Sequence, residues 1–528
     1  MSRMLQVVGV LALAGAYLVV GTSLGAQEQH PSAPAQQSAT SDQHKDADKE
    51  NAPIPPEKFV STHHEMTLGG KSLKYTATAG TLLIRDEEDK PYGSVFYVAY
   101  TLDGAEASSR PISFLYNGGP GSATLWLHMG SFSPVRIQTD SPNPTAGPPF
   151  KVVSNDDSLL DKTDLVFIDA PLTGYSRAAG KATAKDFNGV DQDLRAFDRF
   201  IVRYATVNQR WNSPKFLIGE SYGTTRSAAL ADMLFNDGLQ LNGVVLISSI
   251  LNYNVRAPGY DSIYVFNLPS YAAAAWYFDK IPNKPADLAA WVQQAREFAS
   301  GPYAQALFAG DTLPAAQVDE IANQMSHFTG LSAAYIKEAN LRVSPIRFRK
   351  EVLRDDRKTL GRYDMRFEGV DVDAAGENPS YDASDTSISG AFVAALHDYL
   401  SRELKYETND DYRPSSNSYT QWDWKHKPTS GSPGPGGGDQ SQPYVAADLA
   451  SAIRKNPHMH VFSANGYFDL ATPFFATEFD LDHMDLDPAL RGNVQFGYYP
   501  SGHMIYLNVE ALHTLKSDLA GFITTSIR

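Results

Sequence analysis

The most informative segment of the sequence is Phe216-Leu217-Ile218-Gly219-Glu220-Ser221-Tyr222-Gly223. Its first three residues form a compact apolar run, which indicates a buried parallel strand, and residues 224–234 have the character of a helix. The Gly-x-Ser-x-Gly pattern between them is typical of a sharp strand-to-helix turn, which needs glycine at both flanks and presents the serine oxygen at a helix N-terminus. The segment therefore predicts that Ser221 is a nucleophile; the alternative interpretation is a plain turn.

The residues on either side of this turn predict an α/β fold. Compact apolar runs indicate buried parallel strands at 112–116, 165–168, 216–218 and 244–247. Before the third run, apolar residues recur at helical spacing from Val190 to Tyr204, with Asp186 as a candidate N-cap. This alternation predicts a doubly wound, mostly parallel sheet. Short β-rich runs predict antiparallel strands that open the sheet at 73–77, 81–84 and 94–100.

A large insertion is expected to interrupt this sheet. The strand–helix alternation stops after about Asn252 and resumes at residues 459–463, and helical patterns dominate between them. The helical region ends in a loop or linker rich in Gly, Ser and Pro. We therefore expect an α/β core in two halves, residues 58–252 and 444–528, separated by a helical cap insertion and linker over residues 253–443.

The N-terminal residues predict export. Arg3 precedes an apolar run over residues 7–20 that is short for a membrane span, and small residues follow as far as Ala26. We expect a signal peptide over residues 1–26, with an uncleaved anchor as the alternative. A disordered leader is expected over residues 27–57, which are rich in Gln, Ser, Ala, Pro and charge.

The composition narrows the class of protein. Among 528 residues there is no cysteine, which excludes disulfides and thiolate metal sites and, with export, fits a bacterial periplasm or exterior. The net charge of −15 argues against a nucleic-acid partner, because a phosphate-binding face needs clustered Lys and Arg. No membrane partner is expected after signal cleavage, and the sequence does not indicate an oligomeric state.

The serine of the turn requires two partners. A serine at its ordinary pKa is a weak nucleophile, so Ser221 implies a histidine base and a carboxylate that orients it. Asp469 follows the expected strand 459–463 and His503 follows another strand, so both would project from carboxyl ends of strands. Either residue alone could be an ordinary polar group of a loop. Their order after the turn predicts the catalytic triad Ser221, Asp469 and His503.

A glycine-rich loop directly after the strand 112–116 predicts an oxyanion hole. The loop reads Asn117-Gly118-Gly119-Pro120-Gly121-Ser122, and its glycines free the backbone to aim N–H groups inward. The residue after the nucleophile usually supplies a second donor. We therefore expect the N–H groups of Gly119 and Tyr222 to form the oxyanion hole; the alternative is a simple Gly/Pro turn.

Together these motifs resemble the signatures of the serine carboxypeptidase family. The likeness spans about residues 110–507 and places the helical insertion at the position of the family's cap. It rests on the glycine-rich loop, the serine turn, the Asp469 loop, Gly502-His503-Met504, and a further segment formed by Asp169-Ala170-Pro171 and Gly174-Tyr175-Ser176.

The resemblance implies an α/β-hydrolase that removes single C-terminal residues from peptides. It implies Ser221 as nucleophile, His503 as base, Asp469 as the orienting acid, and Asn117 with Glu220 as the groups that bind the terminal carboxylate of the substrate. Two departures, Ser122 in place of the family's usual cysteine and Gly223-Thr224-Thr225-Arg226 after the turn, suggest a divergent bacterial branch.

The role implied for Glu220 has a physical requirement. A carboxylate beside a substrate carboxylate repels it unless one of the two is protonated. A protonated Glu220 could donate a hydrogen bond, which favours activity at low pH. In the family a second glutamate shares this proton, whereas the resemblance places Ser131 at that position here. The family's acid pair is therefore expected to be broken.

These observations predict an exported serine carboxypeptidase that acts on peptides through an acyl-enzyme and needs no metal or other cofactor. One alternative is another α/β-hydrolase, either an esterase or an aminopeptidase of the proline-iminopeptidase type, which also has a Gly-Gly-Pro-Gly loop. Asn117, in place of the histidine usual before that loop, weighs against it. A second alternative is a catalytically silent homologue that acts as a peptide-binding or scaffold protein.

Three other features carry weaker predictions. The basic stretch 342–366 is interleaved with acidic residues, which indicates a solvated helix face rather than an anion site. His128 could line the cleft or pack in the core. His63-His64-Glu65 and His458-Met459-His460 lack the third and fourth ligands that a metal site needs.

Overall fold

The computed structural model describes residues 52–416, 421–428 and 438–527. The predicted signal peptide (1–26) and most of the predicted leader (27–57) lie outside these residues. Within the leader, Ala52 forms a β-bridge with Gly180, and Glu57 forms an ion pair of 2.5 Å with Arg203. Contacts with the core thus begin before position 58, where the sequence analysis placed the start of the folded part.

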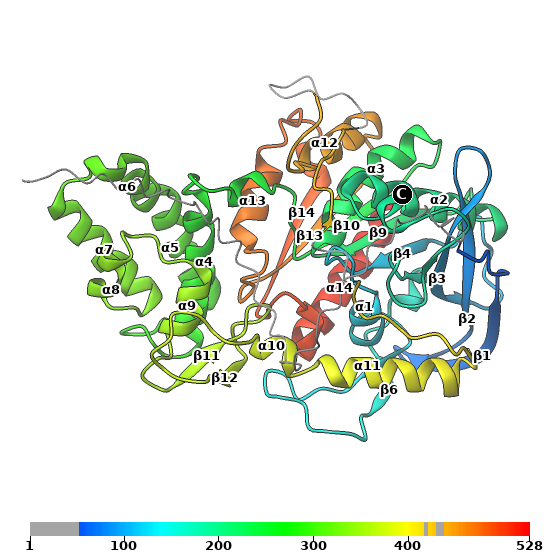
Figure 1. The fold of residues 1–528 in the computed structure, drawn as a ribbon, viewed down its shortest axis with the longest axis horizontal. Helices are drawn as coiled ribbons and strands as arrows, with labels where there is room; N and C mark the ends of the chain where they lie inside the picture. Colours follow the sequence, from blue (N-terminus) through cyan, green and yellow to red (C-terminus); the bar gives the residue numbers. More distant parts are fainter. Residues whose placement is uncertain (1–51, 417–420, 429–437, 528) are drawn as a thin grey trace, which may run out of the picture. The chain divides into compact units, whose positions relative to one another are not determined.

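A ten-stranded, mostly parallel sheet lies at the centre of the described chain (Figure 1). Its spatial order is β1 (Phe59–Leu68), β2 (Lys71–Arg85), β3 (Pro91–Leu102), β7 (Asp164–Ile168), β4 (Ile112–Tyr116), β9 (Lys215–Glu220), β10 (Gly243–Ile247), β13 (His460–Gly466) and β14 (Val494–Tyr499), with the short β8 (Arg177–Ala178) paired to β3. The strands β1, β2 and β3 are antiparallel, β3 is antiparallel to β7, and β7 to β14 are parallel. The predicted α/β-hydrolase sheet, opened by antiparallel strands, is confirmed.

Two local predictions are wrong. The runs 73–77 and 81–84 belong to one long strand, β2, because Gly80 does not break the strand. A side chain at Gly80 would come within 2.6 Å of the Lys58 carbonyl oxygen, so the glycine permits close approach of the chain beside it. Asp186 does not cap the helix α2 (Val190–Val207): it binds Thr183 in a preceding 3₁₀ turn, and the helix starts after Gly189.

Helices cover both faces of the sheet. Successive side chains of its buried strands point to opposite sides, so apolar side chains on both faces must be covered. In β9, Leu217 packs with α2, α3 (Tyr222–Asn236) and α12 (Ala446–Lys455) in one apolar cluster. Its neighbours Phe216 and Ile218 belong to a second cluster on the other face, which contains α1 (Leu125–Gly130), α11 (Ser389–Asp398) and α14 (Val509–Ser526). This arrangement confirms the doubly wound fold.

The insertion between β10 and β13 consists of two differently packed parts. Six helices share an apolar cluster with Phe468 and Phe474 of the core: α4 (Ser262–Tyr277), α5 (Leu288–Phe298), α6 (Ala304–Ala309), α7 (Ala315–Thr329), α8 (Ala333–Glu338) and α9 (Pro345–Glu351). The later helix α11 instead packs on α1 and belongs to the core cluster. The insertion therefore forms a helical cap and also completes one face of the sheet.

Smaller elements join these parts. They are the hairpin β11 (Lys358–Leu360) and β12 (Glu368–Val370), the pair β5 (Val135–Ile137) and β6 (Val152–Ser154), α10 (Ala383–Thr386), and α13 (Phe474–Asp482), which packs on α4. Among the described residues, no helix is both long and apolar enough to cross a bilayer.

Candidate active site

The serine turn lies at the carboxyl end of β9. Ser221 sits between β9 and α3 with φ of +60°, a region that is strained for a residue with a side chain. Its N–H donates to the carbonyl of Ile247 on β10 at 3.0 Å. A side chain at Gly219 would collide with the carbonyl of Gly223, and one at Gly223 would lie 2.9 Å from the Tyr116 oxygen. The glycines are therefore required by close packing around the turn.

Asp469 and His503 meet behind this turn. They follow β13 and β14, and the Asp469 Oδ2 accepts a hydrogen bond of 2.7 Å from His503 Nδ1. The N–H groups of Ala471 and Thr472 donate to Asp469 Oδ1 at 2.7 and 3.0 Å, and the Thr472 hydroxyl donates to Oδ2 at 2.7 Å. Because the carboxylate accepts the Nδ1 proton, the Nε2 of His503 is left as the proton acceptor.

The electrostatic surroundings favour the protonated form of His503. Burial of the ring opposes its charged form, but the carboxyl groups of Asp469 and Glu220 outweigh this and raise the pKa of His503 above its usual value. The side chain is buried apart from the face that borders the pocket. A histidine in this setting can take a proton from a serine and hold it next to a fixed negative charge.

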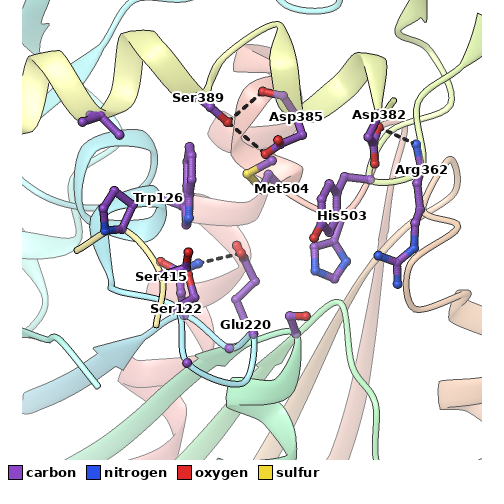
Figure 2. Close-up of a pocket in the computed structure, with 18 of the residues that line it drawn as sticks. Ser122, Trp126, Glu220, Arg362, Asp382, Asp385, Ser389, Ser415, His503 and Met504 are labelled. Atoms are coloured by element: carbon purple, nitrogen blue, oxygen red, sulfur yellow. Dashed lines mark hydrogen bonds between the residues drawn. The ribbon is translucent and has the colours of Figure 1, made fainter. Parts of the chain in front are cut away.

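A pocket of about 940 Å³ brings the predicted site residues together (Figure 2). Its lining includes five of them: Asn117, Gly119, Glu220, Ser221 and His503. Asp469 lies behind the histidine. The backbone nitrogen of Tyr222 abuts Gly118, where an added side chain would collide with it. The glycine-rich loop and the serine turn are therefore in direct contact.

Asn117 and Glu220 form a hydrogen-bonded pair on the wall of this pocket. The Asn117 amide donates to Glu220 Oε1 at 2.7 Å, and its own oxygen accepts the N–H of Leu127 at 3.0 Å. The other oxygen of Glu220 is buried and has no hydrogen-bond partner among the described residues. Burial raises the pKa of Glu220 to about 7. The pair thus offers a carboxyl group that can be neutral near neutral pH.

A sequence model of serine carboxypeptidases matches residues 71–276, which contain the glycine-rich loop and the serine turn. Over this range the chain is similar to the serine carboxypeptidase family. The pheromone-processing carboxypeptidase KEX1 of Saccharomyces cerevisiae is 28% identical over 159 residues, which are 29% of this chain and 21% of that protein. The carboxypeptidase sxa2 of Schizosaccharomyces pombe is 25% identical over 185 residues, 34% of each chain. The alignments thus span about a fifth to a third of these relatives.

A solved structure shows the same fold over a longer range. The crystal structure of KEX1(delta)p, a prohormone-processing carboxypeptidase from Saccharomyces cerevisiae, superimposes with a TM-score of 0.50 at 15% identity. The superposition covers 85% of this chain and 91% of that chain. It therefore extends well beyond residue 276, where the match to the family model ends.

Ser131, which is expected at the position of the family's second glutamate, does not contribute to this pocket. Ser131 is buried at the end of α1, does not line the pocket, and donates its hydroxyl hydrogen bond to the Leu127 carbonyl at 2.6 Å. Glu220 therefore receives no carboxyl partner from this position. The Asn117 amide donates to it, and the Tyr506 hydroxyl also interacts with its carboxyl group.

A buried ion pair between Arg226 and Asp193 contacts the residues that form the site. Arg226, in the unusual segment after the serine turn, binds Asp193 of α2 through Nε and Nη2 at 2.7 and 3.1 Å. Its Nη1 donates to the Asn117 carbonyl at 3.0 Å, and its guanidinium lies 4.0 Å from the ring centre of Phe197 and 5.4 Å from that of Tyr222. Arg226 thus contacts both the glycine-rich loop and Tyr222, which directly follows Ser221.

A second support comes from residues 421–428. The ring of Trp422 packs edge-on against Tyr222 at 5.6 Å between centres. Nearby, the buried His426 lies between two carboxylates, Asp191 at 2.7 Å and Asp448 at 3.1 Å. Burial opposes protonation of the ring, but the two carboxylates raise its pKa to about 9. The charged histidine links this segment to α2 and α12.

The ion pairs of His426 with Asp191 and Asp448 predict that the protein loses stability as the pH rises. Because the pKa of His426 is raised from 6.5 to about 9, its contribution is fully present below pH 6.5 and is lost as the pH rises through 9. We expect the free energy of unfolding in urea to fall by about 2 kcal/mol more for the wild type than for His426→Gln across this range. Parallel curves for the two proteins would show that His426 does not carry this link.

The pocket also contains residues that the sequence analysis missed, and two of them, Arg362 and Tyr363, belong to segment 361–366 of the insertion. The Tyr363 carbonyl accepts the N–H of His503 at 2.6 Å, and the Met365 N–H donates to the Phe468 carbonyl at 3.0 Å. An added side chain at Gly502 would collide with this segment. Segment 361–366 therefore contacts the loops that carry both His503 and Asp469, although no local pattern in the sequence marks it.

The prediction of a solvated helix face over 342–366 is wrong. Only part of this stretch is helical, and Arg349 and Lys350 are buried, with Lys350 bound to Asp371 at 2.5 Å. Arg366 binds Asp364 at 2.6 Å and the hydroxyl of Ser501 at 3.2 Å. The acidic residues nearby in sequence suggested ion pairs on the surface of a helix. In the folded chain, Arg349, Lys350 and Arg366 are instead buried and bound by other residues.

Among the described residues, His128 does not belong to the site. His128 is a packed core residue: its Nε2 lies 2.6 Å from the Tyr100 hydroxyl, its ring stacks on Phe167, and burial lowers its pKa to about 3. Among the described residues, no group of three or more His, Asp or Glu side chains is arranged to hold a metal ion.

Proposed function

We propose that this chain is an exported serine carboxypeptidase, from a bacterial branch of its family, that releases C-terminal residues from peptides. The observation that carries the proposal is the position of Asn117 and Glu220 in one pocket with Ser221 and His503. A general esterase needs the nucleophile and the base. A carboxypeptidase also needs a group beside them that binds a free carboxylate, and this pair supplies one.

The residues of the pocket support a two-step acyl transfer. The Ser221 oxygen attacks the last peptide carbonyl while His503 Nε2 takes its proton, and the N–H groups of Gly119 and Tyr222 stabilise the oxyanion. Collapse expels the C-terminal residue as an amine that receives the proton from His503. Water, deprotonated by the same nitrogen, then attacks the ester, and the serine regains its proton. Asp469 keeps its hydrogen bond to His503 Nδ1 and holds the histidine ring throughout.

Export is supported by the sequence of residues 1–26, and a peptide substrate outside the cell would fit a chain without cysteine. Within the pocket, the terminal carboxylate of the peptide would accept hydrogen bonds from the Asn117 amide and from a protonated Glu220. Glu220 lines the pocket and is hydrogen-bonded to Asn117, so its carboxyl group lies where this contact would form.

The proposal is tested with a panel of N-blocked dipeptides that carry either a free or an amidated C-terminus. We expect hydrolysis of the free acids at a much higher kcat/KM, labelling of Ser221 by an organophosphonate, and neither result with Ser221→Ala. Equal cleavage of the amides, or action only on simple esters or on peptides with a free N-terminus, would overturn the carboxypeptidase assignment and leave another hydrolase in its place.

Glu220 predicts how this activity depends on pH. Because burial raises its pKa to about 7, Glu220 is protonated below that pH and repels the substrate carboxylate above it. We expect kcat/KM for a free-acid dipeptide to fall about tenfold per pH unit above 7, and Glu220→Gln to remove this fall because the amide stays a neutral donor. An N-blocked ester without a carboxylate is the control substrate. An unchanged profile in Glu220→Gln would contradict the prediction.

A further inference from the structure

Arg362 presents a positive charge to the pocket beside the catalytic histidine. The residue is exposed and lines the pocket together with Tyr363 and His503. Figure 2 shows its side chain extending alongside His503. The charge of Arg362 acts on this histidine, where it opposes protonation of the ring. Nothing in the two-step mechanism uses this guanidinium.

The surrounding structure holds Arg362 in place. Its N–H donates to Asp382 Oδ1 at 2.9 Å, and its carbonyl accepts the N–H of Leu470, next to Asp469, at 3.1 Å. The guanidinium lies 5.4 Å from the ring centre of Tyr363, whose ring in turn lies 5.3 Å from that of His503. The cation is therefore tethered to the catalytic loops through both its backbone and its aromatic neighbour.

No carboxylate among the described residues forms an ion pair with the Arg362 guanidinium. Within the described residues, its guanidinium makes no ion pair and no hydrogen bond. Asp382, which accepts the backbone N–H of Arg362, has other partners for the same oxygen: its Oδ1 accepts the N–H and the hydroxyl of Ser384 at 3.1 and 2.6 Å and lies 3.8 Å from Arg349. A guanidinium in this position can bind a carboxylate that enters the pocket.

The location of Arg362 indicates which part of a substrate it would meet. In the proposed function, the departing residue lies between Ser221 and the pair formed by Asn117 and Glu220. Figure 2 shows Arg362 on the opposite side of His503 from Glu220. A peptide whose C-terminus lies at Glu220 would therefore direct its acyl portion, the residues before the scissile bond, towards Arg362.

We propose that Arg362 is a specificity-determining residue that favours peptides with an Asp or Glu side chain on the acyl side of the scissile bond. This inference rests on the proposed carboxypeptidase function. Because the guanidinium is exposed, the gain is modest: a preference of about fivefold for an acidic over an isosteric neutral side chain, reduced by salt.

The experiment compares N-blocked tripeptides that differ by Glu or Gln, placed either at the penultimate residue or at the residue before it. The ratio of kcat/KM for Glu over Gln is measured for the wild type, Arg362→Gln and Arg362→Glu at low and high NaCl. Arg347→Gln is the matched control, because Arg347 is an exposed cation of the same insertion that pairs with Glu377 and does not line the pocket.

We expect a ratio above one for the wild type and the control in at least one of the two positions, falling with added salt. The ratio should approach one in Arg362→Gln and drop below one in Arg362→Glu. Equal kcat/KM for Glu and Gln peptides in the wild type, or a preference that survives Arg362→Gln, overturns the inference and leaves the proposed function intact. Absence of hydrolysis of every peptide overturns both.

Discussion

Asp469→Asn is expected to lower kcat for a free-acid dipeptide by about ten-thousand-fold with little change in KM. The carboxylate accepts the proton of His503 Nδ1 at 2.7 Å and three further hydrogen bonds, from Thr472 and from the N–H of Ala471. An amide at this position would present its NH₂ group to the histidine and favour the tautomer with the proton on Nε2. The ring could then no longer accept the proton of Ser221.

The control for this experiment is Asp480→Asn. Asp480 is also buried, and burial raises its pKa to about 7, but it contacts Asn252 rather than a member of the triad. We expect this variant to keep most of its activity. Comparable losses in both variants would indicate that any buried Asp to Asn change disturbs the fold, and a mild effect of Asp469→Asn would contradict the triad.

Asp193→Asn is expected to cost about 3 kcal/mol of stability, because it leaves the charge of Arg226 buried without a counter-charge. Arg226 is inaccessible to solvent, and its two hydrogen bonds to Asp193 are the contacts that neutralise it. The free energy of unfolding, measured by urea denaturation at neutral pH, checks this expectation. Activity should fall as well, since the same guanidinium holds the Asn117 carbonyl.

An exposed pair provides the comparison. Asp261 binds Arg342 at 2.6 Å, but both side chains are about one third exposed, at 34% and 32%. We expect Asp261→Asn to cost less than about 1 kcal/mol, because water compensates the lost partner. Equal costs for the two variants would mean that burial does not set the energetic importance of the Asp193–Arg226 pair.

The predictions that succeeded concern elements with strong local signals. The run at 112–116 coincides with β4, and the runs at 216–218 and 244–247 fall within β9 and β10, because centrally buried strands are apolar on both faces. The serine turn was equally visible, since its glycines are demanded by backbone contacts at Gly219 and Gly223. Residues that follow such strands can be placed at one sheet edge without tertiary information.

The features that the sequence did not reveal depend on contacts between distant segments. Arg362 and Tyr363 reach the pocket because the insertion folds back onto the Asp469 and His503 loops, and their neighbours in sequence carry no motif. The two ends of the insertion also look alike as helical patterns, yet α11 packs on the sheet and α4 on the cap. Periodicity identifies the buried face of a helix without naming its partner.

Segment 361–366 has a consequence for protein engineering. It belongs to the insertion, yet its backbone is hydrogen-bonded to His503 and to the loop that carries Asp469. A chimera that exchanges the cap between relatives would therefore also exchange residues that position His503 and Asp469. Grafts that retain residues 361–366 of the recipient should keep their catalytic rate and alter only selectivity. Grafts that replace this segment must supply equivalent backbone hydrogen bonds or lose turnover.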